Sequence, residues 1–138
     1  MDTRPQILLL THGGWGMSLL KGVQMILGTA DFVSEIALLP EMTFSEYYQK
    51  VEEKVKTLSK DSVIMTDVFG GTTTNVAAKL GRDFHFKVYS GLNAAMLLEA
   101  CSQIEFSGDV EPECILEAGK SAVKDVVEEV LNSMNKEN

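Results

Sequence analysis

The sequence predicts an α/β fold, a doubly wound and mainly parallel sheet with helices on both faces. Short apolar runs typical of buried strands alternate with longer segments whose apolar residues recur at helical spacing. Three of the runs end in glycine-bearing turns that lead into helices. Parallel connections must cross over the sheet, and this crossing covers both of its faces. The 138 residues suit one domain, expected over residues 1–138.

The first strand and helix are separated by a glycine pair. Residues 6–11 are a compact apolar run, as expected of a buried parallel strand. Residues 15–27 carry one apolar helical face, and Gly28 offers a left-handed stop. Residues 32–39 predict the second strand, which Pro40 closes.

The middle of the chain repeats this pattern. Thr43 and Glu46 form a capping box, in which each side chain bonds a free backbone amide, and a clean amphipathic stripe follows over residues 44–58. Residues 62–67 predict the third strand, which ends at a Gly-Gly turn.

The fourth strand lies between two further helices. The third helix is expected over residues 72–80 with Gly81 as its stop, and the strand over residues 85–89. Asn93 is a good N-cap for a helix over residues 94–101.

The tail is predicted to be helical. Pro112 suits the first turn of a helix, and Gly119 interrupts the helical pattern after it. From residue 122 to residue 131, apolar residues again repeat helically, and the polar residues 134–138 are expected to fray.

Charge and composition exclude several classes of function. A net charge of -8 disfavours binding to nucleic acid or to an anionic membrane, since both need excess Lys and Arg. The apolar run at residues 7–10 is too short for a membrane span or the core of a signal peptide. Cys101 and Cys114 are interpreted as reduced residues. We therefore expect a cytoplasmic location.

His12 is the first candidate for chemistry, because it follows the first strand. Its imidazole is nucleophilic at neutral pH, and the adjoining Gly13 and Gly14 let the backbone approach a bound anion. Ligands of open α/β sheets bind beyond the carboxyl ends of strands. A histidine that only bonds the backbone is the alternative.

Asp67 is the second candidate, and it follows the third strand. If the first and third strands are neighbours, this carboxylate can accept a proton from one ring nitrogen of His12 and leave the other free to attack. Gly71 then leads into a helix N-terminus, where free amides and the hydroxyls of Thr72 and Thr73 can bind phosphate. N-capping is the alternative role for these threonines.

Other catalytic signatures are missing from the sequence. It contains no P-loop, no G-x-G-x-x-G fingerprint, no G-x-S-x-G elbow and no cluster with the spacing of a metal site. A histidine, a carboxylate and an anion cradle favour a covalent phosphohistidine without metal or cofactor. Trp15 either packs on the sheet or contacts a partner.

Three motifs resemble the IIA components of the mannose family of the bacterial phosphoenolpyruvate-dependent sugar phosphotransferase system. They are Leu10-Thr11-His12-Gly13, Asp67-Val68-Phe69-Gly70-Gly71-Thr72 and Ser90-Gly91-Leu92-Asn93-Ala94-Ala95-Met96-Leu97. The resemblance implies an open sheet of order 2-1-3-4 and a homodimer. It also implies an antiparallel edge strand exchanged between subunits near residues 121–127, where periodicity predicts helix.

The same resemblance implies roles for individual residues. His12 would accept a phosphoryl group from the phosphocarrier HPr and pass it to a IIB component beside membrane-embedded IIC and IID components. Asp67 would orient the histidine, and Thr72 would lie beside the phosphate. Phe69 stands where the family often has Trp, and Thr72-Thr73 where it often has Ser-Pro, departures that concern partner fit more than chemistry. Trp15, which follows the histidine loop, and Phe69 are expected at the partner surface.

Three alternatives stay open. One is the related phosphotransfer subunit of a dihydroxyacetone kinase. Another is a flavodoxin-like binding module whose Gly-Gly-Thr turn holds a flavin phosphate. The last is a regulatory domain of a transcription activator, in which phosphorylation of His12 is a signal.

Overall fold

The computed structural model describes residues 3–136 and has a four-stranded parallel sheet of order β2-β1-β3-β4. The predicted fold class and strand order are confirmed. The strands are β1 (Ile7–His12), β2 (Val33–Leu38), β3 (Val63–Thr66) and β4 (Lys87–Tyr89). The helices are α1 (Gly16–Leu27), α2 (Phe44–Val55), α3 (Thr72–Phe84), α4 (Ala94–Ser102), α5 (Pro112–Ser121) and α6 (Val126–Lys136), with a π-helical turn η1 (Gln103–Ser107) after α4.

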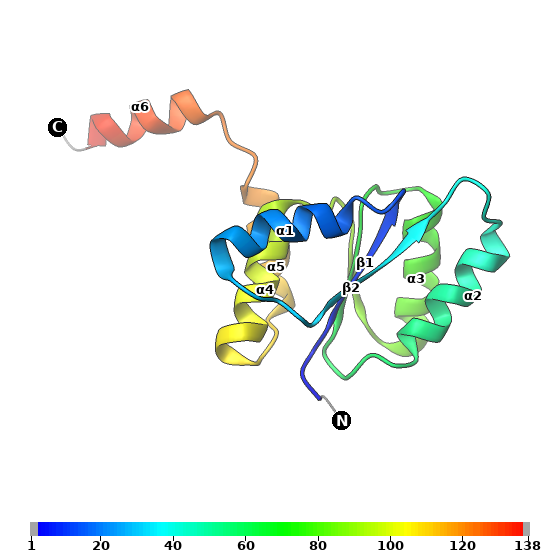
Figure 1. Cartoon of the computed structure of the whole chain (residues 1–138). Helices are drawn as coiled ribbons and strands as arrows, with labels where there is room; N and C mark the ends of the chain where they lie inside the picture. Colours follow the sequence, from blue (N-terminus) through cyan, green and yellow to red (C-terminus); the bar gives the residue numbers. More distant parts are fainter. Residues whose placement is uncertain (1–2, 137–138) are drawn as a thin grey trace.

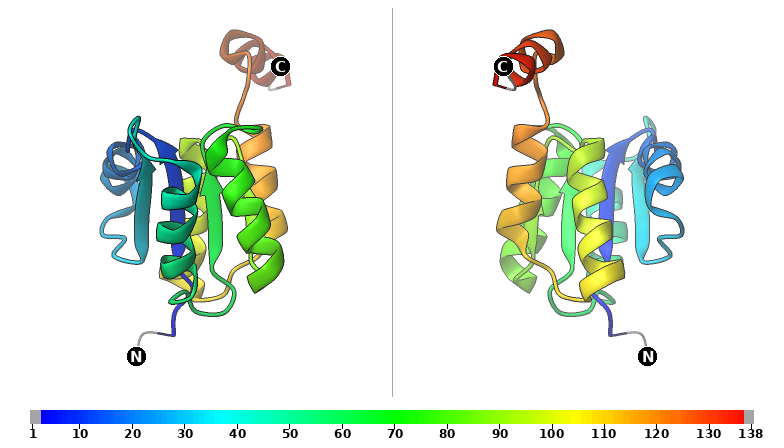
Figure 2. Two further views of the ribbon diagram at one scale, coloured as in Figure 1. Left: turned by 90° about the vertical axis from the view of Figure 1, so that its right-hand side faces the viewer. Right: turned by 90° about the vertical axis from the view of Figure 1, so that its left-hand side faces the viewer.

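Helices cover both faces of the sheet (Figure 1). Helices α1, α4 and α5 lie on one face, and α2 and α3 lie on the other, as the two side views of Figure 2 also show. Side chains of β1 alternate between two buried clusters: Ile7 and Leu9 pack toward α1 and α4, while Leu8 and Leu10 pack toward α2 and α3. All four are fully buried, which explains why this strand is a continuous apolar run.

The position of β1 between β2 and β3 determines where a crevice forms at the edge of the sheet. It pairs in parallel with β2 on one side and with β3 on the other. The chain therefore leaves β1 toward one edge of the sheet and leaves β3 toward the opposite edge. At such a switch point the connecting loops diverge and leave a crevice at the carboxyl ends of the strands.

Two of the predicted caps are confirmed by hydrogen bonds. The amide of Glu46 donates to Thr43 Oγ1 at 3.1 Å, and the amide of Thr43 donates to Glu46 Oε1 at 3.3 Å. The amide of Met96 donates to Asn93 Oδ1 at 3.0 Å. Helix α2 ends at Val55, one turn before the predicted end at residue 58.

The predicted boundary between α3 and β4 is wrong. The helix does not stop at Gly81 but continues to Phe84, and His85 ends it with a left-handed backbone of φ 63°. His85 is therefore a helix cap and not the first residue of the fourth strand, which begins at Lys87. Gly81 has a packing role instead, because it leaves room for Val88 of β4 against α3.

The tail is helical in two segments, as periodicity predicts, but the expected interruption at Gly119 and the edge strand near residues 121–127 are wrong. Helix α5 runs through Gly119, where a Cβ would lie 3.0 Å from Met96 Cε, so this glycine allows close packing on α4. Residues 121–127 form no strand: α5 ends at Ser121 and α6 begins at Val126. A strand needs a neighbouring backbone to pair with, and residues 122–136 are all exposed, with α6 away from the sheet (Figure 1). Of the residues expected to fray, 134–136 form the end of α6, and 137–138 lie outside the described residues.

Residues 3–136 contain no helix with the length and apolar character needed to cross a lipid bilayer. Both cysteines are free thiols: Cys101 is buried within the cluster that packs toward α1 and α4, and Cys114 is exposed on α5.

Replacing Gly81 by alanine tests the packing of α3 on β4. A Cβ at this position would lie 2.5 Å from Val88 Cγ2 and 3.0 Å from the Phe86 carbonyl oxygen. The gain in helix propensity is about 1 kcal/mol, whereas overpacking against backbone costs about 1–3 kcal/mol. We expect Gly81→Ala to lower the free energy of unfolding, measured by urea denaturation.

Gly22→Ala in α1 is the matched control. Gly22 is exposed, and nothing lies within 4 Å of a Cβ built there. This variant should be stabilised by about 0.5–1 kcal/mol. Equal stabilisation of both variants would contradict the packing role of Gly81.

Candidate functional site

The two predicted catalytic residues meet at the carboxyl ends of β1 and β3. His12 is the last residue of β1, and Asp67 directly follows β3. The Asp67 Oδ2 atom accepts two hydrogen bonds from His12, one from its backbone amide at 2.6 Å and one from ring Nδ1 at 2.9 Å. The carboxylate thus holds both the end of the strand and the orientation of the imidazole.

The second oxygen of Asp67 is also satisfied. Its Oδ1 atom accepts hydrogen bonds from the amide of Val68 and the hydroxyl of Thr73, both at 2.9 Å. Burial of the carboxyl opposes its ionisation, but hydrogen bonds from His12 and Thr73 outweigh burial and lower the pKa of Asp67 below its ordinary value. The group is therefore a carboxylate at neutral pH.

This carboxylate decides which tautomer His12 adopts. An ionised carboxylate only accepts hydrogen bonds, so Nδ1 of His12 carries the proton and Nε2 keeps its lone pair. The side chain of Asp67 is 1% exposed, whereas that of His12 is 48% exposed. The pair therefore combines a buried orienting group with an accessible nucleophile.

The start of α3 lies directly against the imidazole. A Cβ at Gly71 would lie 3.3 Å from Cε1 and 3.6 Å from Nε2 of His12, so only glycine leaves this approach open. Gly71 is the N-cap of α3, and the first amides of a helix have no carbonyl partner within it. These amides and the helix dipole favour an anion beside Nε2.

The three threonines that open α3 have different surroundings. Thr72 lines the cavity beside His12. Thr73 is fully buried and donates its hydroxyl proton to Asp67, which corrects the prediction that this hydroxyl binds phosphate. Thr74 donates to the carbonyl oxygen of Val68 at 2.6 Å and so holds the β3–α3 loop.

Gly13 and Gly14 follow His12 and were predicted to bind an anion through their backbone amides, which is wrong for Gly13. The amide of Gly13 donates to the carbonyl oxygen of Leu38 at 2.9 Å, so it is not free for a bound anion, as was predicted. Gly13 and Gly14 have φ values of 75° and 90°, a left-handed backbone that favours glycine. The pair therefore serves to turn the chain from β1 into α1.

Glu35 on β2 is an important residue that the sequence analysis missed. Its Oε2 atom accepts hydrogen bonds from the hydroxyl of Thr11 at 2.6 Å and the amide of Gly16 at 2.7 Å, and its Oε1 from the amide of Met17 at 3.3 Å. It caps α1 from a neighbouring strand. The available signal was a charged residue within the mostly apolar segment 32–39.

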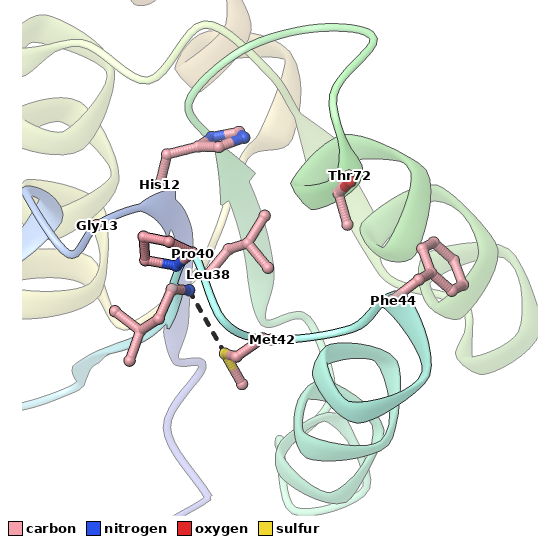
Figure 3. Close-up of a pocket in the computed structure, with 8 residues that line it drawn as sticks. His12, Gly13, Leu38, Pro40, Met42, Phe44 and Thr72 are labelled. Carbon is pink, nitrogen blue, oxygen red and sulfur yellow. Dashed lines mark hydrogen bonds between the residues drawn. The ribbon is translucent and has the colours of Figure 1, made fainter.

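A cavity of about 440 Å³ opens beside the imidazole (Figure 3). It is lined by His12, Gly13, Leu38, Leu39, Pro40, Met42, Phe44 and Thr72. Trp15 and Phe69, predicted at the partner surface, are 40% and 82% exposed. Among residues 3–136, no three His, Cys, Asp or Glu side chains are placed to hold a metal ion.

Comparisons with known proteins show the family to which the chain belongs. The family model EIIA-man, described as the PTS system fructose IIA component, matches residues 6–112. The mannose-specific EIIAB component of the phosphotransferase system from Escherichia coli K12 is 33% identical over 97 residues. That match covers 67% of this chain but only 30% of the relative, so the chain corresponds to less than a third of it.

Solved structures of similar proteins share the fold. The mannose/sorbose specific IIA subunit from Enterococcus faecalis has a TM-score of 0.76 and 26% identity, covering 88% of this chain and 93% of that one. A IIA protein associated with the fucose utilization operon of Streptococcus pneumoniae has a TM-score of 0.80 and 22% identity, covering 94% and 99%. At this lower identity the likeness shows the fold alone.

Glu35→Gln tests the cap on α1. Glutamine offers one acceptor oxygen in place of two and removes the negative charge at the helix N-terminus. We expect the free energy of unfolding to fall by about 1–3 kcal/mol, measured by urea denaturation. Glu46→Gln is the control, because glutamine can keep the capping box at α2. An equal loss in both variants would contradict the special role of Glu35.

Asp67→Asn tests the pH dependence of the central carboxylate. Because folding lowers the pKa of Asp67, its stabilisation is complete above the unfolded-state pKa and is lost as pH falls through the folded-state pKa. We expect the wild type to exceed the variant by about 1–3 kcal/mol at about pH 7, with a smaller difference at about pH 3.

Asp31→Asn is the control for this pH dependence. It removes a carboxyl whose side chain is 73% exposed and pairs with Arg4. It should change the free energy of unfolding by less than about 1 kcal/mol. A difference between wild type and Asp67→Asn that does not shrink in acid would contradict the analysis of Asp67.

Proposed function

The chain belongs to the EIIA-man family of phosphotransferase-system IIA components, and we propose that it carries a phosphoryl group on Nε2 of His12. The donor in this proposal is the phosphorylated form of HPr, and the acceptor is a histidine of a IIB component that serves sugar uptake. The hydrogen bond from His12 Nδ1 to the buried carboxylate of Asp67 is the observation that carries the proposal.

The transfer step balances without a metal or an added base. The lone pair of Nε2 attacks phosphorus, the Nε2–P bond forms, and the bond from phosphorus to the donor nitrogen breaks and returns its electron pair to that nitrogen. The proton on Nδ1 of His12 stays in place, and the ring gains positive charge. Asp67 stabilises that charge at 2.9 Å from Nδ1.

The start of α3 supplies the anion cradle in this mechanism. The phosphoryl oxygens face the free amides after Gly71 and the hydroxyl of Thr72, which spread their negative charge. A contribution of Gly14 to this cradle stays a prediction. A carrier must also release the phosphoryl group, so strong binding by these amides and hydroxyls would slow its transfer to the acceptor.

The partners and location follow from the same proposal. The net charge of -8 suits reversible docking to partners with basic residues around their own histidine. The protein would work in the cytoplasm beside membrane IIC and IID components. We also propose a homodimer, which would cover exposed apolar side chains of α6 such as Val126, Val130 and Leu131.

His12→Asn and His85→Asn together test the proposal, because they remove the two histidines of the chain one at a time. Each protein is incubated with phosphoenolpyruvate, enzyme I and HPr, and its intact mass is measured. We expect an acid-labile gain of one phosphoryl group in the wild type and in His85→Asn, and none in His12→Asn. Asparagine tolerates the left-handed backbone at residue 85.

Addition of the IIB component should then remove the phosphoryl group from the wild type. If HPr is phosphorylated and the wild type gains no mass, the carrier function is wrong. The flavin-binding and regulatory alternatives would then be tested next.

A further inference from the structure

Thr73 contacts the oxygen of Asp67 that does not bind His12. The Oδ2 atom accepts both hydrogen bonds from His12, whereas Oδ1 accepts the hydroxyl proton of Thr73 at 2.9 Å. Thr73 is fully buried in the first turn of α3, and the side chain of Asp67 is 1% exposed. The hydroxyl of Thr73 therefore influences His12 through the charge and the position of this carboxylate.

We propose that the hydroxyl of Thr73, acting through Asp67, keeps the proton on Nδ1 of phosphorylated His12 and thereby lets the ring release the phosphoryl group. Thr73 is in this sense a positioning residue of the transfer. The proposal rests on the proposed carrier function, and it concerns the release of the phosphoryl group to the acceptor.

The release step depends on which atom holds the proton of Nδ1. The lone pair of the acceptor nitrogen attacks phosphorus and forms the new N–P bond, while the Nε2–P bond breaks and returns its electron pair to Nε2 of His12. If Nδ1 keeps its proton, the ring leaves as a neutral imidazole. If Asp67 takes that proton first, the ring must leave as an imidazolate anion, which is a far poorer leaving group.

Phosphorylation increases the competition for this proton. The ring gains positive charge, which makes its N–H group more acidic, and Nδ1 lies 2.9 Å from Oδ2 of Asp67. Burial raises the pKa of Asp67 and so favours the protonated carboxyl, whereas the hydrogen bonds from His12 and Thr73 lower this pKa. The hydrogen bond from Thr73 is made to Oδ1, so it stays in place when the ring changes its charge. It therefore opposes transfer of the proton to Asp67 while the phosphoryl group is held.

The neighbouring amide and phenol do not take over the role of Thr73. The amide of Val68 also donates to Oδ1 at 2.9 Å, but this backbone donor is the same whichever side chain stands at residue 73. Burial and the charges of Asp67 and Glu35 raise the pKa of Tyr47, so this phenol stays neutral. Its hydroxyl donates to a carbonyl oxygen of β2 at 2.8 Å. The carboxyl is also too deeply buried for bulk water to replace the hydroxyl.

Thr73→Val tests the proposal, because valine has nearly the shape of threonine and lacks the hydroxyl. Without this hydrogen bond the carboxylate is more basic and stabilises the charged ring more strongly. We expect the equilibrium of phosphoryl exchange with HPr to shift about 3- to 10-fold toward the phosphorylated chain, which is part of what one hydrogen bond to a charged group is worth. Release to the IIB component, measured as the decay of the phosphorylated mass, should slow by a similar factor. Thr73→Ser should restore both values.

Hydrolysis distinguishes this role from a merely structural one. The phosphorylated Thr73→Val protein should lose its phosphoryl group to water more slowly than the wild type, because the same ring is the leaving group. A variant whose site is only loosened would lose the group faster, because water would reach phosphorus more easily. The proton NMR signal of His12 Nδ1 gives a second signature in the unphosphorylated protein. It should move downfield in Thr73→Val as the hydrogen bond to Asp67 strengthens.

Thr74→Val is the matched control. Thr74 is also buried in the first turn of α3, but its hydroxyl bonds the carbonyl oxygen of Val68 at 2.6 Å and the hydroxyl of Thr66 at 2.7 Å. This variant loses a buried hydroxyl that does not bond Asp67, so its exchange equilibrium and NMR signal should stay at the wild-type values. Wild-type values or faster hydrolysis in Thr73→Val would overturn the proposal while the wild type still accepts the phosphoryl group. A wild type that accepts none would instead overturn the carrier function.

Discussion

The hydrogen bonds of one buried carboxylate organise this protein. Asp67 accepts the backbone amide and the ring nitrogen of His12 on one oxygen, and the amide of Val68 and the hydroxyl of Thr73 on the other. It therefore links the end of β1, the end of β3 and the first turn of α3. The same bonds that keep the carboxylate ionised hold the histidine in one tautomer, so structure and reactivity share their cause.

A second carboxylate supports the other side of the site. Glu35 reaches from β2 to Thr11 and to the first amides of α1, so the loop that carries His12 is held between two acidic side chains. Both carboxylates accept hydrogen bonds from backbone amides and hydroxyls. The hydrogen bonds that hold this loop do not come from Lys or Arg. Backbone donors keep their positions because the sheet and the helices fix them, which preorganises the site.

The surroundings of His12 have two sides. Gly71 and Thr72 lie on a polar side, where the proposed phosphoryl group would bind, and Leu39 and Phe44 on an apolar, exposed side. A partner that covers the apolar side also excludes water from the polar side, where hydrogen bonds then become stronger. In the proposed function, this coupling would let docking energy assist the transfer of the phosphoryl group.

The sequence by itself determined the fold class, the main helices and strands, and the pairing of His12 with Asp67. These features depend on local patterns: strand runs, caps and strand-end positions that parallel topology brings to one edge. Only the tertiary structure decided the roles of Glu35, Gly13 and Thr73, because each depends on a partner from another strand or loop. The same reason explains Gly81, which is locally typical of a helix stop but lies inside α3, packed against Val88 of β4. The position of α6 away from the sheet was also not predictable, because local periodicity indicates a helix but not what it packs against.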